Sequence, residues 1–336
     1  MHMTHSVDVA IIGAGPVGLF TVFEAGYLGY KCAVLDSLPE IGGQLTALYP
    51  EKPIYDIPGY PSIQAGELIN KLADQAAPFN PDYVLGEPVS GVRKTNEGFE
   101  ITAGHHKLNA KVVCIAGGMG VFTPRKPPLA NLEAFEAHSV HYAVRDKARF
   151  AGKTLVIAGG GDSAADWTVE LAPIAKHIHL VHRRDEFRAA EATVKRIYEL
   201  AEAGKITLQT LSQLKAIDGD AGHLKTVTLN HMNDGDRTVE ADDLLCFFGL
   251  APSLGPIAEW GVGISGKKVS VQADTMQTAV PGILAVGDIT DYPGKLDLIL
   301  TGFAEAAIAA KTAQGIINPD KKFKLVYSTS QGIKGI

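Results

Sequence analysis

The chain has few cysteines. Only Cys32, Cys114 and Cys246 occur among its 336 residues, and no pair of them has the CxxC spacing. This scarcity gives no support to a redox dithiol, a disulfide framework or a structural zinc site, and we expect no metal. Each cysteine lies in an apolar, strand-like run (KCAVLD, VVCIAGG and LLCFFG), where a free thiol behaves as a small apolar side chain. All three are therefore predicted to be buried packing residues.

An excess of positive charge and a long apolar run are also missing. The net charge of −6 argues against general binding to nucleic acid, which would need Lys and Arg gathered on one face. No stretch approaches the roughly 20 apolar residues that span a bilayer. The segment VAIIGAGPVGLFTVF is interrupted by Gly and Pro, and no basic segment precedes it, so it is unlike a signal peptide. We expect a cytoplasmic protein that binds neither nucleic acid nor membrane.

A dinucleotide-binding motif lies near the N-terminus. The mainly apolar run 7–12 predicts a buried parallel strand, and it leads into a GxGxxG motif formed by Gly13, Gly15 and Gly18. In such a motif the first glycine permits a tight turn, the second lets a pyrophosphate approach the backbone, and the third lets the following helix pack closely. A second apolar run, 32–35, ends in Asp36, which is placed to accept hydrogen bonds from ribose hydroxyls.

The same pattern recurs in KTLVIAGGGDSAADW. The apolar run 155–158 precedes a GxGxxA motif formed by Gly159, Gly161 and Ala164. At the register of Asp36, the second copy has a basic group: His182, Arg183, Arg184 and, one turn further on, Arg188. Guanidinium groups bind a 2′-phosphate through charge-assisted hydrogen bonds, whereas a carboxylate repels it. The second site is therefore predicted to prefer NADP to NAD, with the pyrophosphate at the turn formed by Gly161, Asp162 and Ser163.

Two unlike dinucleotide sites suggest hydride transfer between a nicotinamide and a retained flavin, so the first site is predicted to hold FAD. The length of 336 residues exceeds what one core usually organises. We predict an α/β protein with two Rossmann-like domains, the second inserted in the first: FAD-binding residues 1–119 and 248–336, and NADPH-binding residues 120–247. In ILAVGDIT, Asp288 follows a strand and can bind a ribityl hydroxyl.

Several motifs carry a family resemblance. The order of GAGPVG, IGGQL, IYDIPGYP, GGGDSA, HRRDEFR and AVGDI resembles that of the low-molecular-weight thioredoxin reductases, which are two-dinucleotide-binding flavoproteins. Those enzymes carry a redox CxxC just before the second glycine motif, where this chain has residues 142–146, YAVRD. Without thiols there, dithiol exchange with thioredoxin is excluded. Together with FTPRKPP, GLAPSLGPI and VYSTS, the chain resembles the cysteine-free ferredoxin–NADP reductases of the thioredoxin-reductase-like type.

The resemblance implies roles for individual residues. Asp36 would bind the adenosine ribose of FAD, and Gln44 and Asp288 the polar parts of the flavin. Tyr49 and Tyr327 would stack on opposite flavin faces, as the residues closest to the chemistry. Further FAD contacts would be Val89, Phe122 and Thr329. The resemblance also implies a homodimer, and no side chain is expected to act as an acid, base or nucleophile.

The electron acceptor stays open at this point. Ferredoxin is the expected partner, with flavodoxin as an alternative, and docking would use local basic residues: Arg145, Lys147, Arg149, Lys321, Lys322 and Lys324. The same residues are equally compatible with ordinary solvated surface charge. An NADPH-dependent flavin reductase acting on a quinone, flavodoxin or another small acceptor would share every cofactor motif. A third hypothesis for the function is a flavoprotein that senses the NADPH/NADP ratio without turnover.

Overall fold

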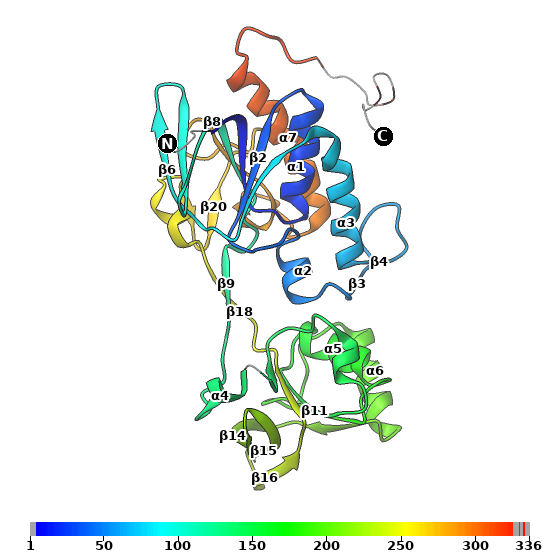
Figure 1. The fold of residues 1–336 in the computed structure, drawn as a ribbon. Coiled ribbons are helices and arrows are strands. Elements are labelled where there is room, and N and C mark those ends of the chain that lie inside the picture. The colour runs from blue at the N-terminus through cyan, green and yellow to red at the C-terminus, as the bar shows by residue number, and fades with distance from the viewer. Residues whose placement is uncertain (1–4, 137, 325–328, 330–331, 333–336) are drawn as a thin grey trace. The chain divides into compact units, whose positions relative to one another are not determined.

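The computed structural model divides the chain into two compact units (Figure 1). It describes residues 5–136, 138–324, 329 and 332. Unit 1 comprises Met1–Phe122 and Pro252–Ile336, and unit 2 comprises Thr123–Ala251. The sequence-based boundaries, after 119 and after 247, lie a few residues before these crossings. At the crossings, strand β9 (Val121–Pro124) pairs with β18 (Leu250–Ser253). The predicted α/β class, with one unit inserted in the other, is confirmed.

Unit 1 is built on a seven-stranded sheet in the order β5-β2-β1-β8-β7-β6, with β21 pairing with β8 as well. Its strands are β1 (His5–Ile12), β2 (Cys32–Asp36), β5 (Asp82–Leu85), β6 (Val89–Thr95), β7 (Gly98–Ala103), β8 (His106–Ile115) and β21 (Ile283–Ala285). Strands β5, β2, β1, β8 and β21 pair in parallel, and β6, β7 and β8 pair antiparallel. Because β1 is covered on both faces, residues 9–12 at its C-terminal end are all apolar and buried rather than alternating with polar residues.

Three helices of unit 1 lie side by side in Figure 1: α1 (Pro16–Tyr27), α3 (Ala65–Ala76) and α7 (Ile299–Ile317). Helices α1 and α7 share a buried cluster with Ile11 and Cys114 and so cover one face of the sheet. The short helix α2 (Gln44–Leu48) is anchored by Leu45, which packs in a second cluster with Leu19 and Leu68. This packing fixes the segment that follows β2 beside the start of α1.

The smaller elements of unit 1 surround this framework. They are β3 (Pro53–Ile54), β4 (Ile63–Gln64), the 3₁₀ helices η1 (Ala77–Phe79), η3 (Gly255–Glu259) and η4 (Gly287–Ile289), and β19 (Ile264–Ser265), β20 (Lys268–Ser270) and β22 (Thr290–Asp291). Strands β19, β20 and β22 form a small sheet of their own. The turn η4 follows β21 directly, so the GDI motif stands where that parallel strand ends.

Unit 2 has a parallel five-stranded sheet in the order β10-β17-β11-β12-β13. The strands are β10 (Val140–His141), β11 (Thr154–Ala158), β12 (His177–Val181), β13 (Ile206–Gln209) and β17 (Asp243–Cys246). An antiparallel meander adds β14 (Ser212–Asp220), β15 (His223–His231) and β16 (Gly235–Glu240). The helices are α4 (Leu132–Glu136), η2 (Lys147–Phe150), α5 (Asp162–Leu171) and α6 (Glu191–Glu202).

The burial of the cysteines was predicted correctly. Cys32 and Cys114 lie on the two strands that flank β1, and Cys246 ends β17; each has at most 3% of its surface exposed. Among the residues described, none of the helices has the length and apolar character of a membrane span.

Candidate dinucleotide sites

The first glycine turn connects β1 to α1. Gly13 has a φ of +116°, which favours glycine, and its nitrogen donates to the carbonyl oxygen of Leu35 at 2.8 Å. A methyl group at Gly18 would lie 1.9 Å from the carbonyl oxygen of Gly13, so the turn and the helix are in direct contact. Gly15 caps the helix without any side chain, and a methyl group there would meet nothing within 4 Å. The N-terminus of α1 is therefore open to an anionic ligand.

Asp36 at the end of β2 closes the other side of this turn. Its Oδ2 accepts a hydrogen bond from the nitrogen of Ala14 at 2.6 Å, and its Oδ1 accepts one from the nitrogen of Leu38 at 2.9 Å. Burial raises the pKa of Asp36 and outweighs these two hydrogen bonds, which lower it. Each carboxylate oxygen keeps a further lone pair, so the group can also accept from a ribose hydroxyl.

Two later segments approach the first glycine turn. A methyl group at Gly43 would lie 3.3 Å from the Cα of Gly15, and Nε2 of Gln44 lies 3.6 Å from the position that a methyl group would take at Gly118. The IGGQL segment therefore lies against the GAG turn and reaches the glycine-rich segment after β8. The side-chain amide of Gln44 is thus held beside the backbone of Gly118, which carries no side chain of its own.

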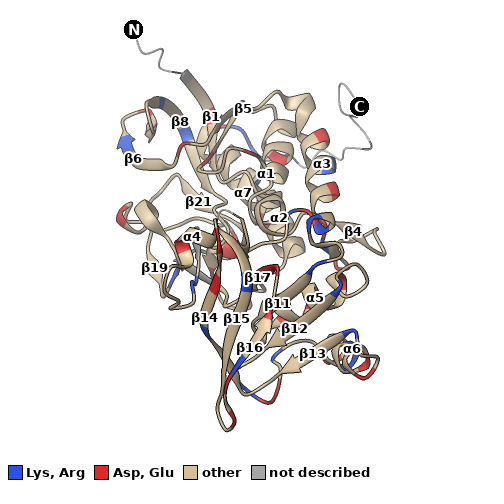
Figure 2. Cartoon of the chain, turned by 60° about the horizontal axis from the view of Figure 1, so that its bottom comes forward, with Lys and Arg blue, Asp and Glu red and all other residues tan. Residues whose placement is uncertain are grey.

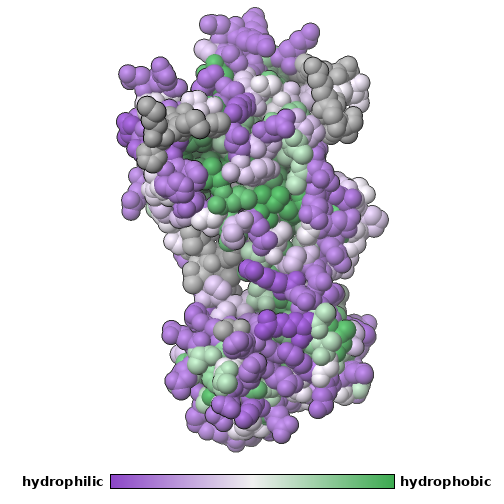
Figure 3. Space-filling model, viewed as in Figure 1, coloured by the Kyte–Doolittle hydropathy of each residue, from purple (hydrophilic) through white to green (hydrophobic). Residues whose placement is uncertain are grey.

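Tyr49 and Asp288 complete this region. Tyr49 caps the C-terminal end of α2, and burial together with the nearby charge of Asp288 raises its pKa. Burial is also the largest influence on Asp288, and its pKa is raised. Figure 3 shows apolar side chains gathered on the face of unit 1 that it displays.

The remaining predicted FAD contacts are less informative. The side chain of Val89 is 8% exposed and packs in the core cluster that contains Leu35. Phe122 belongs to β9, but its side chain lies outside the described part of the chain, as does Tyr327 as a whole. Thr329 is described and exposed.

The second glycine turn, between β11 and α5, repeats the geometry of the first. A methyl group at Gly159 would lie 2.8 Å from the Cβ of Ala164, which matches the close turn–helix contact at Gly13 and Gly18. Gly161 caps α5 without a side chain. Ser163, in the first turn of α5, is exposed, and Oδ1 of Asp162 accepts a hydrogen bond from the nitrogen of Ala190 at 3.1 Å. This helix N-terminus is thus a second candidate anion site.

His182 occupies the space beside this turn. A methyl group at Gly160 would lie 2.1 Å from Cε1 of His182, so the imidazole stands where any side chain at residue 160 would have to go. Nε2 of His182 is 3.1 Å from the carbonyl oxygen of Glu186, and the ring stacks on Phe187 with the ring centroids 5.4 Å apart. The HRRDEFR segment is therefore folded around its histidine. Sequence reasoning missed Gly160, because the GxGxxA pattern leaves this position free.

The arginines of this segment form an unbalanced basic group. Burial lowers the pKa of His182, and so do the charges of Arg184, Arg183 and Arg188. In the described part of the chain, none of the three pairs with a carboxylate. Three cations without an anionic partner beside a helix N-terminus suit a phosphorylated ligand.

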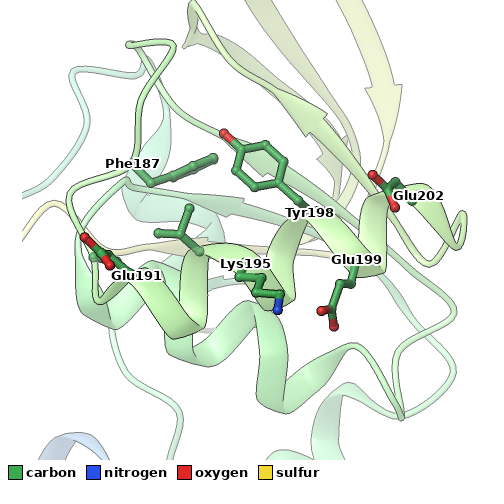
Figure 4. Close-up of a pocket in the computed structure, with 8 residues that line it drawn as sticks. Phe187, Glu191, Lys195, Tyr198, Glu199 and Glu202 are labelled. Carbon is green, nitrogen blue, oxygen red and sulfur yellow. The ribbon is translucent and has the colours of Figure 1, made fainter.

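A cavity of about 590 Å³ lies on the outer face of α6 (Figure 4). It is lined by Phe187, Ala189, Glu191, Val194, Lys195, Tyr198, Glu199 and Glu202. Three of these residues are glutamates and only one is basic, so the cavity is poorly suited to a phosphate group. We assign no cofactor to it.

Comparison with known proteins places this arrangement in a family. The profile described as pyridine nucleotide-disulphide oxidoreductase matches residues 7–313. The chain belongs to the pyridine nucleotide-disulphide oxidoreductase family. Ferredoxin–NADP reductase of Rickettsia rickettsii (strain Iowa) is 51% identical over 328 residues, which cover 97% of this chain and 96% of that protein. Ferredoxin–NADP reductase of Rhodospirillum rubrum is 50% identical over 335 residues, which cover 98% and 97%.

Solved structures agree on the fold. The crystal structure of T. acidophilum thioredoxin reductase matches 92% of this chain and 98% of its own, with a TM-score of 0.78 and 26% identity. Thioredoxin reductase of Lactococcus lactis in the FR conformation matches 93% and 99%, with the same TM-score and identity. Both likenesses extend over nearly the whole chain, as expected of two Rossmann-like domains in this family.

The thiols of this pyridine nucleotide-disulphide oxidoreductase are unsuited to disulfide chemistry. Burial raises the pKa of Cys32, Cys114 and Cys246 to about 12, and all three are free. The segment before the second glycine turn is occupied instead by Tyr142, whose hydroxyl donates to Oε1 of Glu136 at 2.6 Å. This family member therefore lacks the thiolate nucleophile that exchange requires.

Proposed function

We propose that the chain is a ferredoxin–NADP reductase that uses FAD. When bound, FAD supplies a ring that accepts a hydride from NADPH and releases electrons one at a time. The observation that carries the proposal is the pairing of two open glycine turns with unlike partners: a carboxylate at the first and three uncompensated arginines at the second. The names of relatives that are about half identical over almost the full chain support ferredoxin as the acceptor.

In this proposal, unit 1 binds FAD. The residues assigned to it are Gly13, Gly15, Gly18, Asp36, Gln44, Tyr49, Val89, Phe122, Asp288 and Thr329. The open N-terminus of α1 binds the pyrophosphate, and Asp36 accepts from the adenosine ribose. Tyr49 would cover one face of the flavin, and Tyr327, which lies outside the described residues, is assigned to the other face by the family resemblance. The fit rests on Gly15 at the start of α1, where an added methyl group would meet no atom within 4 Å, and on Gly43, which lies against it.

Unit 2 binds NADPH. Its assigned residues are Gly159, Gly161, Asp162, Ser163, His182, Arg183, Arg184 and Arg188. The arginines bind the 2′-phosphate, and the N-terminus of α5 binds the pyrophosphate. His182 stays neutral and holds the loop, since burial and the neighbouring arginines disfavour its charged form. No side chain acts as an acid, base or nucleophile; the protein orients the reactants and excludes side reactions.

We assign ferredoxin docking to the lysines that follow α7. We also propose that the enzyme is a homodimer and that it is cytoplasmic. In Figure 2, Lys and Arg are interspersed with Asp and Glu along both units, so docking depends on a local group of charges. Lys321, Lys322 and Lys324 are exposed within four residues of one another. In the other predicted group, Lys147 pairs with Glu170 at 3.2 Å and Arg149 donates to the carbonyl oxygen of His138 at 2.6 Å. Part of that second group is thus engaged within the chain.

The test is steady-state turnover of the purified protein with each pairing of donor and acceptor. NADPH and NADH serve as donors, and ferredoxin, thioredoxin and a quinone serve as acceptors. The proposal expects preference for NADPH, efficient reduction of ferredoxin and none of thioredoxin. Efficient turnover with the quinone but not with ferredoxin would favour a flavin reductase. Slow turnover with every acceptor would favour a sensor of the NADPH/NADP ratio.

A further inference from the structure

A buried ion pair lies next to the GDI turn. Oε1 of Glu305, on α7, accepts from Nζ of Lys295 at 2.6 Å and from the hydroxyl of Tyr292 at 2.7 Å. The side chains of Glu305 and Lys295 are only 2% and 5% exposed. Oε2 of the same carboxylate accepts from the backbone nitrogen of Gly287 at 2.5 Å. One carboxylate therefore joins α7, the 292–295 turn and the first residue of η4.

The backbone is tightly packed at this junction. A methyl group at Gly302, one turn before Glu305 on α7, would lie 2.4 Å from Cγ2 of Val17 and 3.4 Å from the Cα of Gly287. Val17 belongs to the first turn of α1, whose N-terminus is the candidate pyrophosphate site. The first residue of the GDI turn, Gly287, is thus held both by close packing against α7 and by its hydrogen bond to Glu305.

Stability alone is a weak reason for this arrangement. Buried residues of α7 are otherwise mostly small and apolar, with Ala306, Ala309 and Ala313 following Glu305. Withdrawing two opposite charges from water costs about as much as their attraction returns, so an apolar pair of similar volume is often equally stable. The specific contact of the ion pair is with the GDI turn, through the nitrogen of Gly287.

We propose that Glu305 and Lys295 are positioning residues that hold the Gly287–Ile289 turn so that Asp288 faces the FAD. The inference rests on the FAD site of the proposed function and assigns residues that this site did not include. Glu305 fixes the backbone of the turn through the nitrogen of Gly287, one residue before Asp288. Lys295 neutralises Glu305, and its charge also favours the ionised form of Asp288, against burial and the charges of Asp297 and Glu305.

The decisive variant replaces both charges at once: Lys295→Met together with Glu305→Leu. Because the double variant leaves no unpaired buried charge, it should fold, whereas either single change alone leaves a charged group without its partner. The nitrogen of Gly287 then loses its acceptor, and the turn is free to move. The control is Lys311→Met, which makes the same lysine-to-methionine change at an exposed position of α7.

The measurement is the FAD dissociation constant, obtained by diluting the holoenzyme and following the recovery of FAD fluorescence. Circular dichroism at saturating FAD checks that each variant is folded. We expect the dissociation constant to rise at least tenfold in the double variant and less than twofold in Lys311→Met. The dissociation constant of Lys295→Arg, which keeps the charge, should rise less than that of the double variant.

Two other outcomes have different meanings. A folded double variant whose dissociation constant stays within twofold of wild type overturns the inference and leaves the proposed function intact. Wild-type protein that binds no FAD overturns the proposed function itself, together with the inference that rests on it.

Discussion

The backbone nitrogen of Arg188 donates to the carbonyl oxygen of Gly160 at 2.6 Å. This hydrogen bond ties the end of the arginine segment to the glycine turn that precedes α5. A bridge between Gly161 and Arg188 extends the same contact. The groups assigned to the 2′-phosphate and to the pyrophosphate of NADPH are thus parts of one folded unit, and the spacing between them is set by the protein before any ligand arrives.

The first prediction concerns cofactor preference. Arg183→Ala and Arg188→Ala should each raise the KM for NADPH by roughly tenfold to a hundredfold, because charge-assisted hydrogen bonds contribute about 1.5–3 kcal/mol. The KM for NADH should change little, since NADH carries no 2′-phosphate. The measurement is the ratio of kcat/KM for the two donors with a fixed acceptor. The control is Arg196→Ala, whose side chain pairs with Glu199 on the surface of α6. An unchanged ratio in both arginine variants would refute the assignment.

The second prediction concerns Gly160. In Gly160→Ala the new methyl group must displace the ring of His182, and the arginine segment that folds around this ring has to move with it. We expect the KM for NADPH to rise about tenfold, a change of about 1.4 kcal/mol in binding, while FAD content stays at the wild-type level. Gly315→Ala is the control, because a methyl group at that position meets nothing within 4 Å. Loss of FAD in Gly160→Ala would mean that the damage is not confined to unit 2.

The two glycine turns, and the residues in register with them, could be located from the sequence. The run 7–12, the glycines and Asp36 follow in a fixed register because strand, turn and helix are local structures with strong backbone requirements. Counting the same interval in the second copy identified His182 as the counterpart of Asp36. The contacts that hold these residues could not be predicted in this way. Gly160 is a variable position of the motif, and only the fold brings the ring of His182 against it.

Glu305 and Lys295 were missed for a related reason. A single glutamate in TGFAEAAIAAKTA looks like an ordinary exposed charge of a helix, and Lys295 lies in a turn. Only the packing of α7 on the sheet reveals that the carboxylate is buried and faces Gly287. The one available signal was the glutamate itself, placed among alanines with helical spacing. The fold also places the side chain of Val89 in the core cluster, and its contact with FAD stays a prediction.

The third prediction concerns thiol reagents. With the pKa of each cysteine raised to about 12, only about one thiol in ten thousand is ionised at pH 8, and all three are buried as well. Iodoacetamide should therefore leave the native protein unmodified and its activity unchanged over an hour at pH 8. Mass spectrometry should find three alkylated cysteines only after unfolding in urea. Rapid loss of ferredoxin reduction on alkylation would contradict the absence of a thiol from the reaction.

The last prediction is a pH dependence of unit 2. Burial, followed by the charges of the neighbouring arginines, lowers the pKa of His182 below its ordinary value of 6.5. The unfolded chain then binds more protons than the folded one, so this residue makes unit 2 less stable as the pH falls below 6.5. In His182→Gln this part of the pH dependence should disappear. Urea unfolding between pH 5 and pH 8, followed by the fluorescence of Trp167 in a Trp260→Phe background, reports unit 2 alone, because Trp167 is buried in α5.

A bound phosphate should reverse this effect. An anion beside the imidazole favours its charged form, so saturating NADPH should raise the pKa of His182 and make unit 2 less sensitive to acid. His106→Gln, at an exposed position of unit 1, is the control and should leave the unfolding of unit 2 unchanged. If the stability of His182→Gln falls between pH 6.5 and pH 5 as steeply as that of wild type, another group is responsible for the acid sensitivity. The role of His182 in the arginine loop would then depend on the packing of its ring and not on its protonation state.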